Sequence, residues 1–196
     1  MDEFEKYSNI PIINGLSPSS HPTQVLSDIF TIQEIKKKSI SKLKLCWIGD
    51  ANNNMMNSLV EACIKFSVYL NIACPKSYQP NKKLISLIKK QKGKIKIFNK
   101  KEIAIKNSDV VMTDKIISLN DKVNKKKKLK SFKNFKLDTK TMNLAKKDAI
   151  FLHCLPRGSE VTEEVFLGKQ SKVWQQALNR VYVQKSILLY CFGKLR

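Results

Sequence analysis

The sequence predicts an α/β fold built on a doubly wound parallel sheet of about five strands flanked by helices. Short apolar runs of strand length alternate with longer segments whose apolar residues recur at helical spacing. This alternation favours parallel strands joined by right-handed crossovers. Polar residues also follow several of the apolar runs, as is usual where an open sheet binds ligands at the carboxyl ends of its strands. The 196 residues suffice for one such domain.

The first part of the chain contains one expected strand and one expected helix. An apolar run over residues 10–13 predicts a short strand that ends at an Asn14-Gly15 turn, and a loop rich in serine follows. Pro22 suits the first turn of a helix whose apolar residues recur as far as about residue 33. Lysines from Lys36 onward favour its negative C-terminal end.

The middle of the chain supplies four strands with helices between them. We expect strands at residues 43–48, 72–75, 94–98 and 109–114, and helices at 54–70, 81–91 and 103–106. The first of these helices follows three consecutive asparagines, which are ordinary helix caps but also suit recognition of a polar ligand. The densest lysine run, Lys122 to Lys133, is expected to form a solvated helical or loop face.

A further strand begins at Ile150, and polar and reactive residue types follow its apolar run. These residues are His153, Cys154, Pro156 and Arg157. A buried strand with this ending delivers reactive side chains to the carboxyl edge of a sheet, although a core strand with a polar end is the simpler alternative for a His-Cys pair alone. The remaining helices are expected near residues 139–146, near 160–166 and from 174 onward.

The net charge of +21 does not favour nucleic-acid binding. Only three of the 37 basic residues are arginine, the residue type that reads phosphates and guanine edges with a planar fork. No apolar run approaches the roughly 20 residues of a membrane span. The acidic start lacks the order of a signal peptide. We therefore expect a cytoplasmic protein with neither nucleic acid nor membrane as a partner.

The five cysteines indicate neither a disulfide framework nor a metal site. Their number is odd and none forms a Cys-x-x-Cys pair. Cys46, Cys63 and Cys74 lie in apolar runs and are expected in the core, and Cys191 lies in the last helix. Cys154 alone is placed for chemistry, near His153 and Arg157. We expect it to be more accessible and more thiolate-like than Cys46 or Cys63.

Several polar residues are expected to meet in one crevice. His21 and Gln24 share a face of the first helical turn, where a neutral imidazole and an amide can donate hydrogen bonds to a carbonyl or phosphate oxygen. A capping histidine is the simpler alternative. Asn54, Asp114 and Cys154 fall just beyond strand ends. There is no Gly-x-Gly-x-x-Gly or P-loop motif, so this Rossmann-like fold is not expected to hold a nucleotide cofactor.

Six motifs, taken in order, resemble those of ornithine carbamoyltransferases. They are Pro11-Ile12-Ile13-Asn14-Gly15-Leu16, His21-Pro22-Thr23-Gln24, Gly49-Asp50-Ala51-Asn52-Asn53-Asn54-Met55, Thr113-Asp114, His153-Cys154-Leu155-Pro156-Arg157 and Asn179-Arg180. The resemblance covers nearly the whole chain. The His-Cys-Leu-Pro motif is specific, because the related aspartate enzymes carry proline where Cys154 stands.

The resemblance implies a transferase of arginine metabolism that forms citrulline from carbamoyl phosphate and L-ornithine without metal or cofactor. It implies catalytic roles for Cys154, Arg180 and His21. The implied contacts to carbamoyl phosphate are His21, Gln24, Cys154, Leu155 and Arg180. The implied contacts to ornithine are Asn54, Asp114, Ser118, Leu119 and Cys154.

The sequence also departs from the family pattern. It resembles the ornithine-binding domain, with residues 21–196 as that domain and residues 1–20 as a remnant of the connection from a carbamoyl-phosphate domain. The phosphate-gripping Ser-Thr-Arg-Thr-Arg loop of that other domain has no counterpart here. In the family's Asp-x-x-x-Ser-Met-Gly loop, Leu119 and Asn120 replace Met and Gly, and Ile116 replaces an expected Trp. Leu178 replaces an expected Glu.

Two interpretations therefore stay open. The chain is an ornithine carbamoyltransferase, or it is the ornithine-binding half of one whose other domain is encoded separately. Alternatively, it is a catalytically inactive remnant that at most binds an amino acid or a partner. The family is trimeric, but we expect self-association through the apolar last helix instead, at Trp174, Leu188, Leu189 and Phe192.

Overall fold

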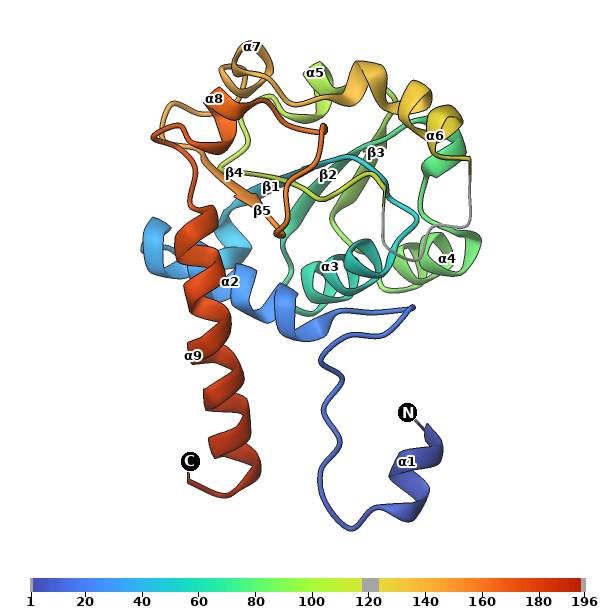
Figure 1. Ribbon diagram of the computed structural model, residues 1–196, viewed down its shortest axis with the longest axis vertical. Helices are drawn as coiled ribbons and strands as arrows, with labels where there is room; N and C mark the ends of the chain where they lie inside the picture. Colours follow the sequence, from blue (N-terminus) through green and yellow to red (C-terminus); the bar gives the residue numbers. More distant parts are fainter. Residues whose placement is uncertain (1, 118–123, 195–196) are drawn as a thin grey trace.

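The centre of the protein is a five-stranded parallel sheet, as the sequence predicts (Figure 1). The structure is a computed structural model that describes residues 2–117 and 124–194. The strands are β1 (Lys44–Ile48), β2 (Tyr69–Ala73), β3 (Ile95–Phe98), β4 (Val110–Thr113) and β5 (Ile150–His153). Their order in the sheet is β3-β2-β1-β4-β5, and all four neighbouring pairs are parallel. The chain therefore reverses direction across the sheet between β1 and β4, where open α/β folds bind ligands.

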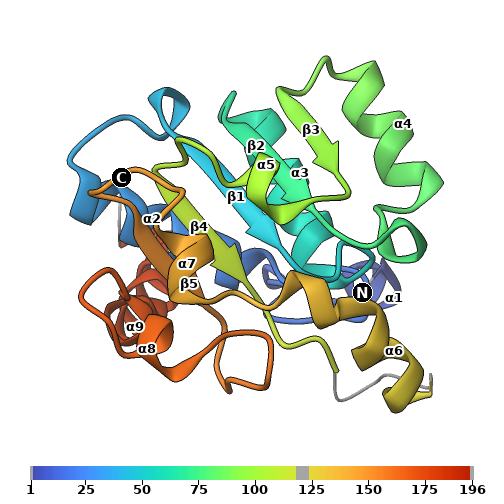
Figure 2. The same ribbon diagram turned by 90° about the horizontal axis from the view of Figure 1, so that it is seen from above.

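Helices cover both faces of the sheet (Figures 1 and 2). One face carries α2 (Pro22–Lys36), α3 (Asn54–Lys65) and α4 (Lys82–Lys90). The other carries the shorter helices α5 (Lys101–Ala104), α6 (Lys125–Phe132), α7 (Thr139–Met142) and α8 (Glu163–Phe166). The long α9 (Val173–Cys191) packs against α2 and β5. Among the helices of residues 2–117 and 124–194, none is both long and apolar enough to cross a membrane.

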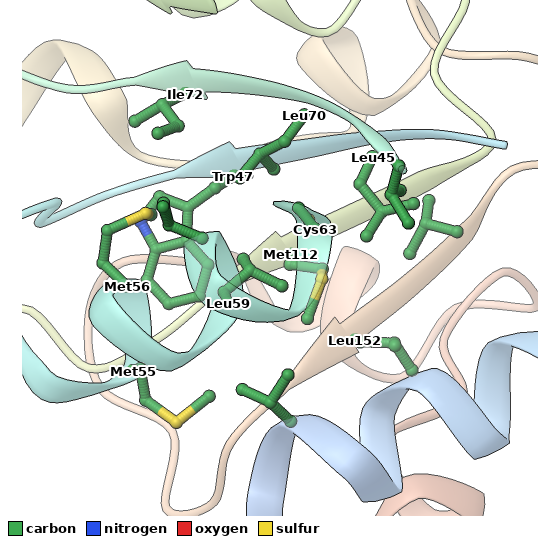
Figure 3. Packing of buried hydrophobic residues seen from close by; sticks show 14 of the residues in the cluster. Leu45, Trp47, Met55, Met56, Leu59, Cys63, Leu70, Ile72, Met112 and Leu152 are labelled. Carbon is green, nitrogen blue, oxygen red and sulfur yellow. The ribbon is translucent and has the colours of Figure 1, made fainter. Parts of the chain in front are cut away.

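The two cores follow from the alternation of side chains along each strand. In β1, Leu45 and Trp47 face α3, whereas Cys46 and Ile48 face the short helices. Figure 3 shows the first core, in which strand residues meet the apolar face of α3. Trp47 also donates a hydrogen bond of 3.1 Å from its indole nitrogen to the Asp50 carbonyl oxygen. This bond fixes the turn that leads from β1 toward α3.

The N-terminal segment differs from the prediction. Residues 10–13 form no strand, because they pair with no other strand among the described residues and Ile10 is 74% exposed. A short helix that the sequence analysis did not predict, α1 (Asp2–Tyr7), precedes them and lies apart from the α/β body in Figure 1. An apolar run forms a strand only where its backbone can hydrogen-bond to a neighbouring strand. Residues 10–13 have no such neighbour among the described residues, so their apolar composition was not sufficient.

Two further predictions need correction. The helix expected to continue to residue 70 ends at Lys65, because the chain turns at Ser67 with a φ of 55° and Leu70 becomes part of β2. The lysine run is not wholly solvated. Lys128 in α6 is 4% exposed, and its ammonium lies 2.7 Å from a carboxylate oxygen of the buried Asp50. Burial of that pair ties α6 to the turn after β1.

Candidate active site between β5, α2 and α9

A polar cavity of about 300 Å³ lies where the end of β5 meets α2 and α9. Its lining residues are Gln24, His153, Cys154, Leu155, Gln176, Ala177, Arg180, Val181 and Gln184. The structure thus brings together four residues singled out from the sequence, which are Gln24, Cys154, Leu155 and Arg180. Three segments far apart in the chain supply them, as expected for a ligand site at the carboxyl edge of a sheet.

His21 lies at the N-terminal end of α2, outside the lining of this cavity. Its backbone N–H donates to the Ser58 hydroxyl at 2.9 Å, which fixes the start of α2 against α3. Its side chain makes no capping hydrogen bond within the described chain, so the alternative of a capping histidine does not hold. Burial and the nearby Arg180 guanidinium lower the pKa of His21, so its imidazole is held neutral.

A chain of hydrogen bonds behind the cavity joins β5, α9 and α2. The His153 backbone N–H donates to Gln176 Oε1 at 2.9 Å, and Gln176 Nε2 donates to Asp28 Oδ1 at 2.7 Å. Gln24 Nε2 donates to the same Asp28 oxygen at 2.8 Å. Burial raises the pKa of Asp28 to about 6, against the opposing effect of the two amide hydrogen bonds.

Asp28 and Gln176 were not among the site residues expected from the sequence. Asp28 carried a usable signal, because it lies four residues after Gln24 and among the apolar positions Val25, Ile29 and Ile32. An acid on the apolar face of a helix needs a buried partner. Gln176 carried no comparable signal, since a glutamine early in a long helix is ordinary.

The imidazole of His153 is a supporting group, not a reactive one. It is 2% exposed, and Nε2 lies 2.9 Å from Glu160 Oε1, while Nδ1 contacts the Cys154 carbonyl oxygen. The ring packs edge-on against Phe166. Glu160 also accepts the backbone N–H of Gly158. Burial raises the pKa of Glu160, but these hydrogen bonds outweigh burial and hold it below its usual value. The pair anchors the loop that carries Cys154.

Cys154 differs from the prediction in one respect. It is half-buried whereas Cys46 and Cys63 are buried, so the expected greater accessibility is confirmed. The expected thiolate character is wrong. Burial, and then the carboxylates of Asp114 and Asp28, raise the pKa of Cys154 well above its usual value. The guanidinium of Arg157 does not offset them, because it lies over the ring of Phe166 instead, 5.0 Å from its centroid.

Three buried polar atoms near the cavity have no hydrogen-bond partner within residues 2–117 and 124–194. They are His21 Nδ1, Asp28 Oδ2 and Arg180 Nε. The charge of Arg180 acts on His21, Asp28 and Cys154 alike, so these groups share one electrostatic environment. Buried polar groups normally have partners, and their exceptions concentrate at functional sites. The arrangement suits a small polar ligand with its own donors and acceptors.

The expected ornithine contacts are more dispersed. Asp114 directly follows β4, accepts the backbone N–H of Lys115 at 2.7 Å and acts electrostatically on Cys154. Burial raises its pKa. Asn54 begins α3, lies outside the cavity lining and donates from its amide to the Ser17 carbonyl oxygen at 2.9 Å. Ser118 and Leu119 lie outside the described residues.

The fold and the cavity define an open α/β domain with a ligand site at the carboxyl edge of its sheet. Comparison with known families makes the assignment definite. The profile for "Aspartate/ornithine carbamoyltransferase, Asp/Orn binding domain" matches residues 41–191, and the profile for the carbamoyl-P binding domain of the same family matches residues 1–34. The chain therefore belongs to the aspartate/ornithine carbamoyltransferase family, which confirms the resemblance seen in the sequence.

Individual relatives agree. The chain is 41% identical to an ornithine carbamoyltransferase of Methanococcus aeolicus, over 99% of this chain and 66% of the relative. It is 43% identical to one of Caldicellulosiruptor saccharolyticus, over 100% of this chain and 65% of the relative. The chain thus spans about two thirds of the length of these relatives.

Solved structures show the same pattern. The anabolic ornithine carbamoyltransferase of Campylobacter jejuni superposes with a TM-score of 0.90 at 41% identity, over 98% of this chain and 65% of that one. The Pyrococcus furiosus ornithine carbamoyltransferase superposes with a TM-score of 0.89 at 35% identity, over 100% of this chain and 64% of that one.

Proposed function

We propose that this chain forms the ornithine-binding side, and part of the carbamoyl-group site, of an ornithine carbamoyltransferase. One observation carries the proposal. The cavity combines Gln24, from the segment matched by the carbamoyl-P binding profile, with Cys154 and Arg180, from the segment matched by the Asp/Orn binding profile. The reaction converts carbamoyl phosphate and L-ornithine to L-citrulline and phosphate, and we assign it to arginine metabolism in the cytoplasm.

The chemistry is nucleophilic substitution at a carbonyl carbon. The lone pair of the ornithine δ-amine forms a bond to the carbamoyl carbon, and the carbonyl electrons move onto oxygen. The Arg180 guanidinium, whose Nε has no hydrogen-bond partner among the described residues, stabilises this oxyanion. When the tetrahedral intermediate collapses, the bond to the phosphate oxygen breaks. Phosphate leaves with the electron pair, and the proton lost from the amine goes to phosphate or solvent.

The raised pKa of Cys154 suits this reaction. Only an uncharged δ-amine has a lone pair for attack, and a thiolate beside it would hold the amine as an ammonium ion. A neutral thiol avoids that ion pair and still contacts the δ-nitrogen. As the new bond to the carbamoyl carbon forms, the δ-nitrogen gains positive charge, and the neutral imidazole of His21 adds no cation to oppose that charge. The site thus favours the reactive protonation state of the nucleophile.

Ornithine is proposed to bind with its α-ammonium toward the Asp114 carboxylate, which follows β4 on the side of Cys154. Asn54, Ser118 and Leu119 complete the proposed contacts to the amino-acid end. Because burial raises the pKa of Asp114, its ionisation and the binding of a cation support each other. Ornithine affinity is therefore expected to fall as pH falls through that raised pKa.

The phosphate group is proposed to need a second source of positive charge. It carries about two negative charges near neutral pH. Among the described residues that line the cavity, Arg180 is the one arginine or lysine, and it faces the carbamoyl end. We infer that a carbamoyl-phosphate domain supplies the remaining cations. Losing such a clamp removes orientation and leaving-group stabilisation, together on the order of a thousandfold in rate.

The test is citrulline formation by the purified 196-residue chain, alone and mixed with a separately produced carbamoyl-phosphate domain of a relative. We expect rates at least about a thousandfold higher in the mixture. Robust citrulline formation by the chain alone would contradict the need for a second domain. No citrulline in the mixture, together with no ornithine binding by calorimetry, would contradict the enzyme proposal and leave the remnant interpretation.

A further inference from the structure

Asp28 is the most deeply buried carboxylate near the cavity, and the mechanism above does not use it. It is 0% exposed at the junction of α2, α9 and β5. Its Oδ1 accepts two amide hydrogen bonds, from Gln24 and from Gln176. Its Oδ2 has no partner within the described part of the chain. Burying an ionisable group costs stability, so its position calls for a physical reason.

The orientation of Gln176 is fixed by its other partner. A backbone N–H can only donate, so the oxygen of the Gln176 amide must face His153 N–H, at 2.9 Å. The amide nitrogen of Gln176 then faces Asp28 Oδ1, at 2.7 Å. Asp28 is consequently held as an acceptor by a group that cannot turn round. That fixed acceptor decides which way the second glutamine points.

Gln24 must therefore also present its nitrogen to Asp28, at 2.8 Å. The Gln24 side chain lines the cavity beside Cys154 and Arg180. One N–H of this nitrogen is used by Asp28, and the carbonyl oxygen, held on the opposite side of the amide, is the acceptor offered to a bound ligand. Gln24 thus enters the site chiefly as a hydrogen-bond acceptor, whereas the sequence had suggested a donor.

We propose that Asp28 is a positioning residue, which turns the carbonyl oxygen of Gln24 toward the bound acyl group and so selects a carbamoyl NH2 over a methyl group. This inference rests on the proposed function. A site built to accept a hydrogen bond from a substrate N–H rejects an analogue that lacks it, because the acceptor is then left unpaired. Acetyl phosphate is that analogue, with CH3 in place of NH2.

The electrostatics agree with this geometry. The charges facing Asp28 are Arg180 of α9, which lowers its pKa, and Asp114 after β4, which raises it. The Asp28 charge in turn raises the pKa of Cys154, which directly follows β5. Burial outweighs the rest and raises the pKa to about 6. Near neutral pH the carboxylate is ionised, and an ionised carboxylate only accepts hydrogen bonds. The orientation of Gln24 is then unambiguous.

Three variants separate positioning from stability. Asp28→Leu removes the acceptor at similar volume, and Asp28→Asn keeps an oxygen that Gln176 still orients. Thr31→Val is the matched control. It lies one turn further along α2 and breaks the bond from Asn179 Nδ2 to Thr31 Oγ1, 2.9 Å, in the same buried seam. It does not touch Gln24.

The first readout needs no turnover. The side-chain 15N–1H resonances of Gln24, assigned by their loss in Gln24→Ala, are followed in the 196-residue chain against pH. We expect slow hydrogen exchange and a shift with a midpoint near pH 6. Asp28→Asn should remove the shift but keep the protection, whereas Asp28→Leu should speed exchange at least about tenfold. Fast exchange and no titration in the parent chain would overturn the proposal.

The second readout is discrimination in the mixture with a carbamoyl-phosphate domain. The ratio of the inhibition constant of acetyl phosphate to the KM of carbamoyl phosphate should fall about tenfold or more in Asp28→Leu. It should stay within about threefold of the parent in Asp28→Asn and Thr31→Val. An unchanged ratio in Asp28→Leu would overturn the proposal. If no mixture forms citrulline, the function proposal fails, and the amide measurement alone decides the role of Asp28.

Discussion

The two halves of α9 break the usual rule of burial in opposite ways. In the first half, the buried residues include the polar Gln176 and Asn179. In the second half, the described residues are all exposed or half-exposed, and several are large and apolar, such as Tyr182, Leu188 and Tyr190. Buried polar groups and exposed apolar faces are the two informative departures in a protein surface. The first half therefore borders the candidate site, and the second half presents an apolar surface that the described chain leaves uncovered.

The surroundings of each half support this difference. The first half shares the hydrogen-bonded seam with α2, in which Asn179 Nδ2 also donates to Glu34 Oε2 at 2.9 Å. The second half borders an apolar cavity of about 550 Å³ between α2 and α9. Within the part of the chain that the structure describes, no charged side chain lines this cavity. The lining residues are Leu26, Ile29, Phe30, Gln33, Ile40, Phe66, Tyr182, Val183, Ser186, Ile187 and Tyr190.

The largest expected effect comes from the polar half. Arg180→Ala should lower the kcat/KM of the reconstituted mixture on the order of a hundredfold to a thousandfold, because it removes the proposed oxyanion donor. Ornithine affinity by calorimetry should change much less. Lys185→Ala, on the same helix but exposed, is the control and should leave the rate unchanged. Equal losses in the two variants would contradict the division of the helix.

The next effect is the pH dependence of stability set by Asp28. The carboxyl pKa is about 6 in the folded chain and 3.8 in a model peptide, so the folded state binds more protons between these values. Stability attributable to Asp28 therefore falls as pH rises through this window, by on the order of 3 kcal/mol, and stays lost above it. Urea denaturation from pH 4 to 7 should show this loss in the parent relative to Asp28→Asn. Parallel curves for the two proteins would contradict the burial of a titrating carboxyl.

Thiol labelling compares the halves directly. Cys154 lies beside the polar half, and Cys191 ends the apolar half; both are half-buried. The raised pKa of Cys154 should slow its reaction with a thiolate-dependent reagent, so Cys191 should label first. Cys154 should follow, ahead of the buried Cys46 and Cys63. Peptide mass mapping over time gives the order. Labelling of Cys46 or Cys63 before Cys154 would show that the cavity does not admit small reagents.

Substitutions in the apolar half of α9 are expected to change stability least but to change the oligomeric state clearly. Its exposed side chains should cause self-association of the 196-residue chain. Leu188→Lys combined with Phe192→Ser should shift the chain toward monomer in sedimentation velocity, and should alter the free energy of unfolding by no more than about 0.5 kcal/mol. A parent chain that is monomeric and binds no hydrophobic dye would contradict this expectation.

Much of the sheet could be predicted from the sequence, because four apolar runs of strand length end in recognisable turns. β2 was misplaced, since the apolar spacing of α3 appears to continue through Leu70 while the chain has already turned at Ser67. The site was predictable where residues follow strands, as Cys154 follows β5. Asp28 and Gln176 were not predicted. Asp28 carried a local signal in its helical spacing from Gln24, but its hydrogen bond with Gln176 joins α2 to α9, and no local spacing indicates that contact.

The hydrogen bonds that attach residues 14–21 to α3 have a consequence for ligand binding. Asn54 and Asn57 hold the carbonyl oxygens of Ser17 and Ser19, at 2.9 and 2.8 Å. Under the proposed function, the amide of Asn54 also contacts ornithine, so the same side-chain amide interacts with both the Ser17 carbonyl oxygen and the substrate. Breaking the attachment of residues 14–21 to α3 would change the position of the Asn54 amide. Binding of ornithine to that amide would in turn change the strength of the attachment. Such coupling between two binding events is reciprocal, so the ornithine affinity should depend on whether the segment before α2 is attached to α3.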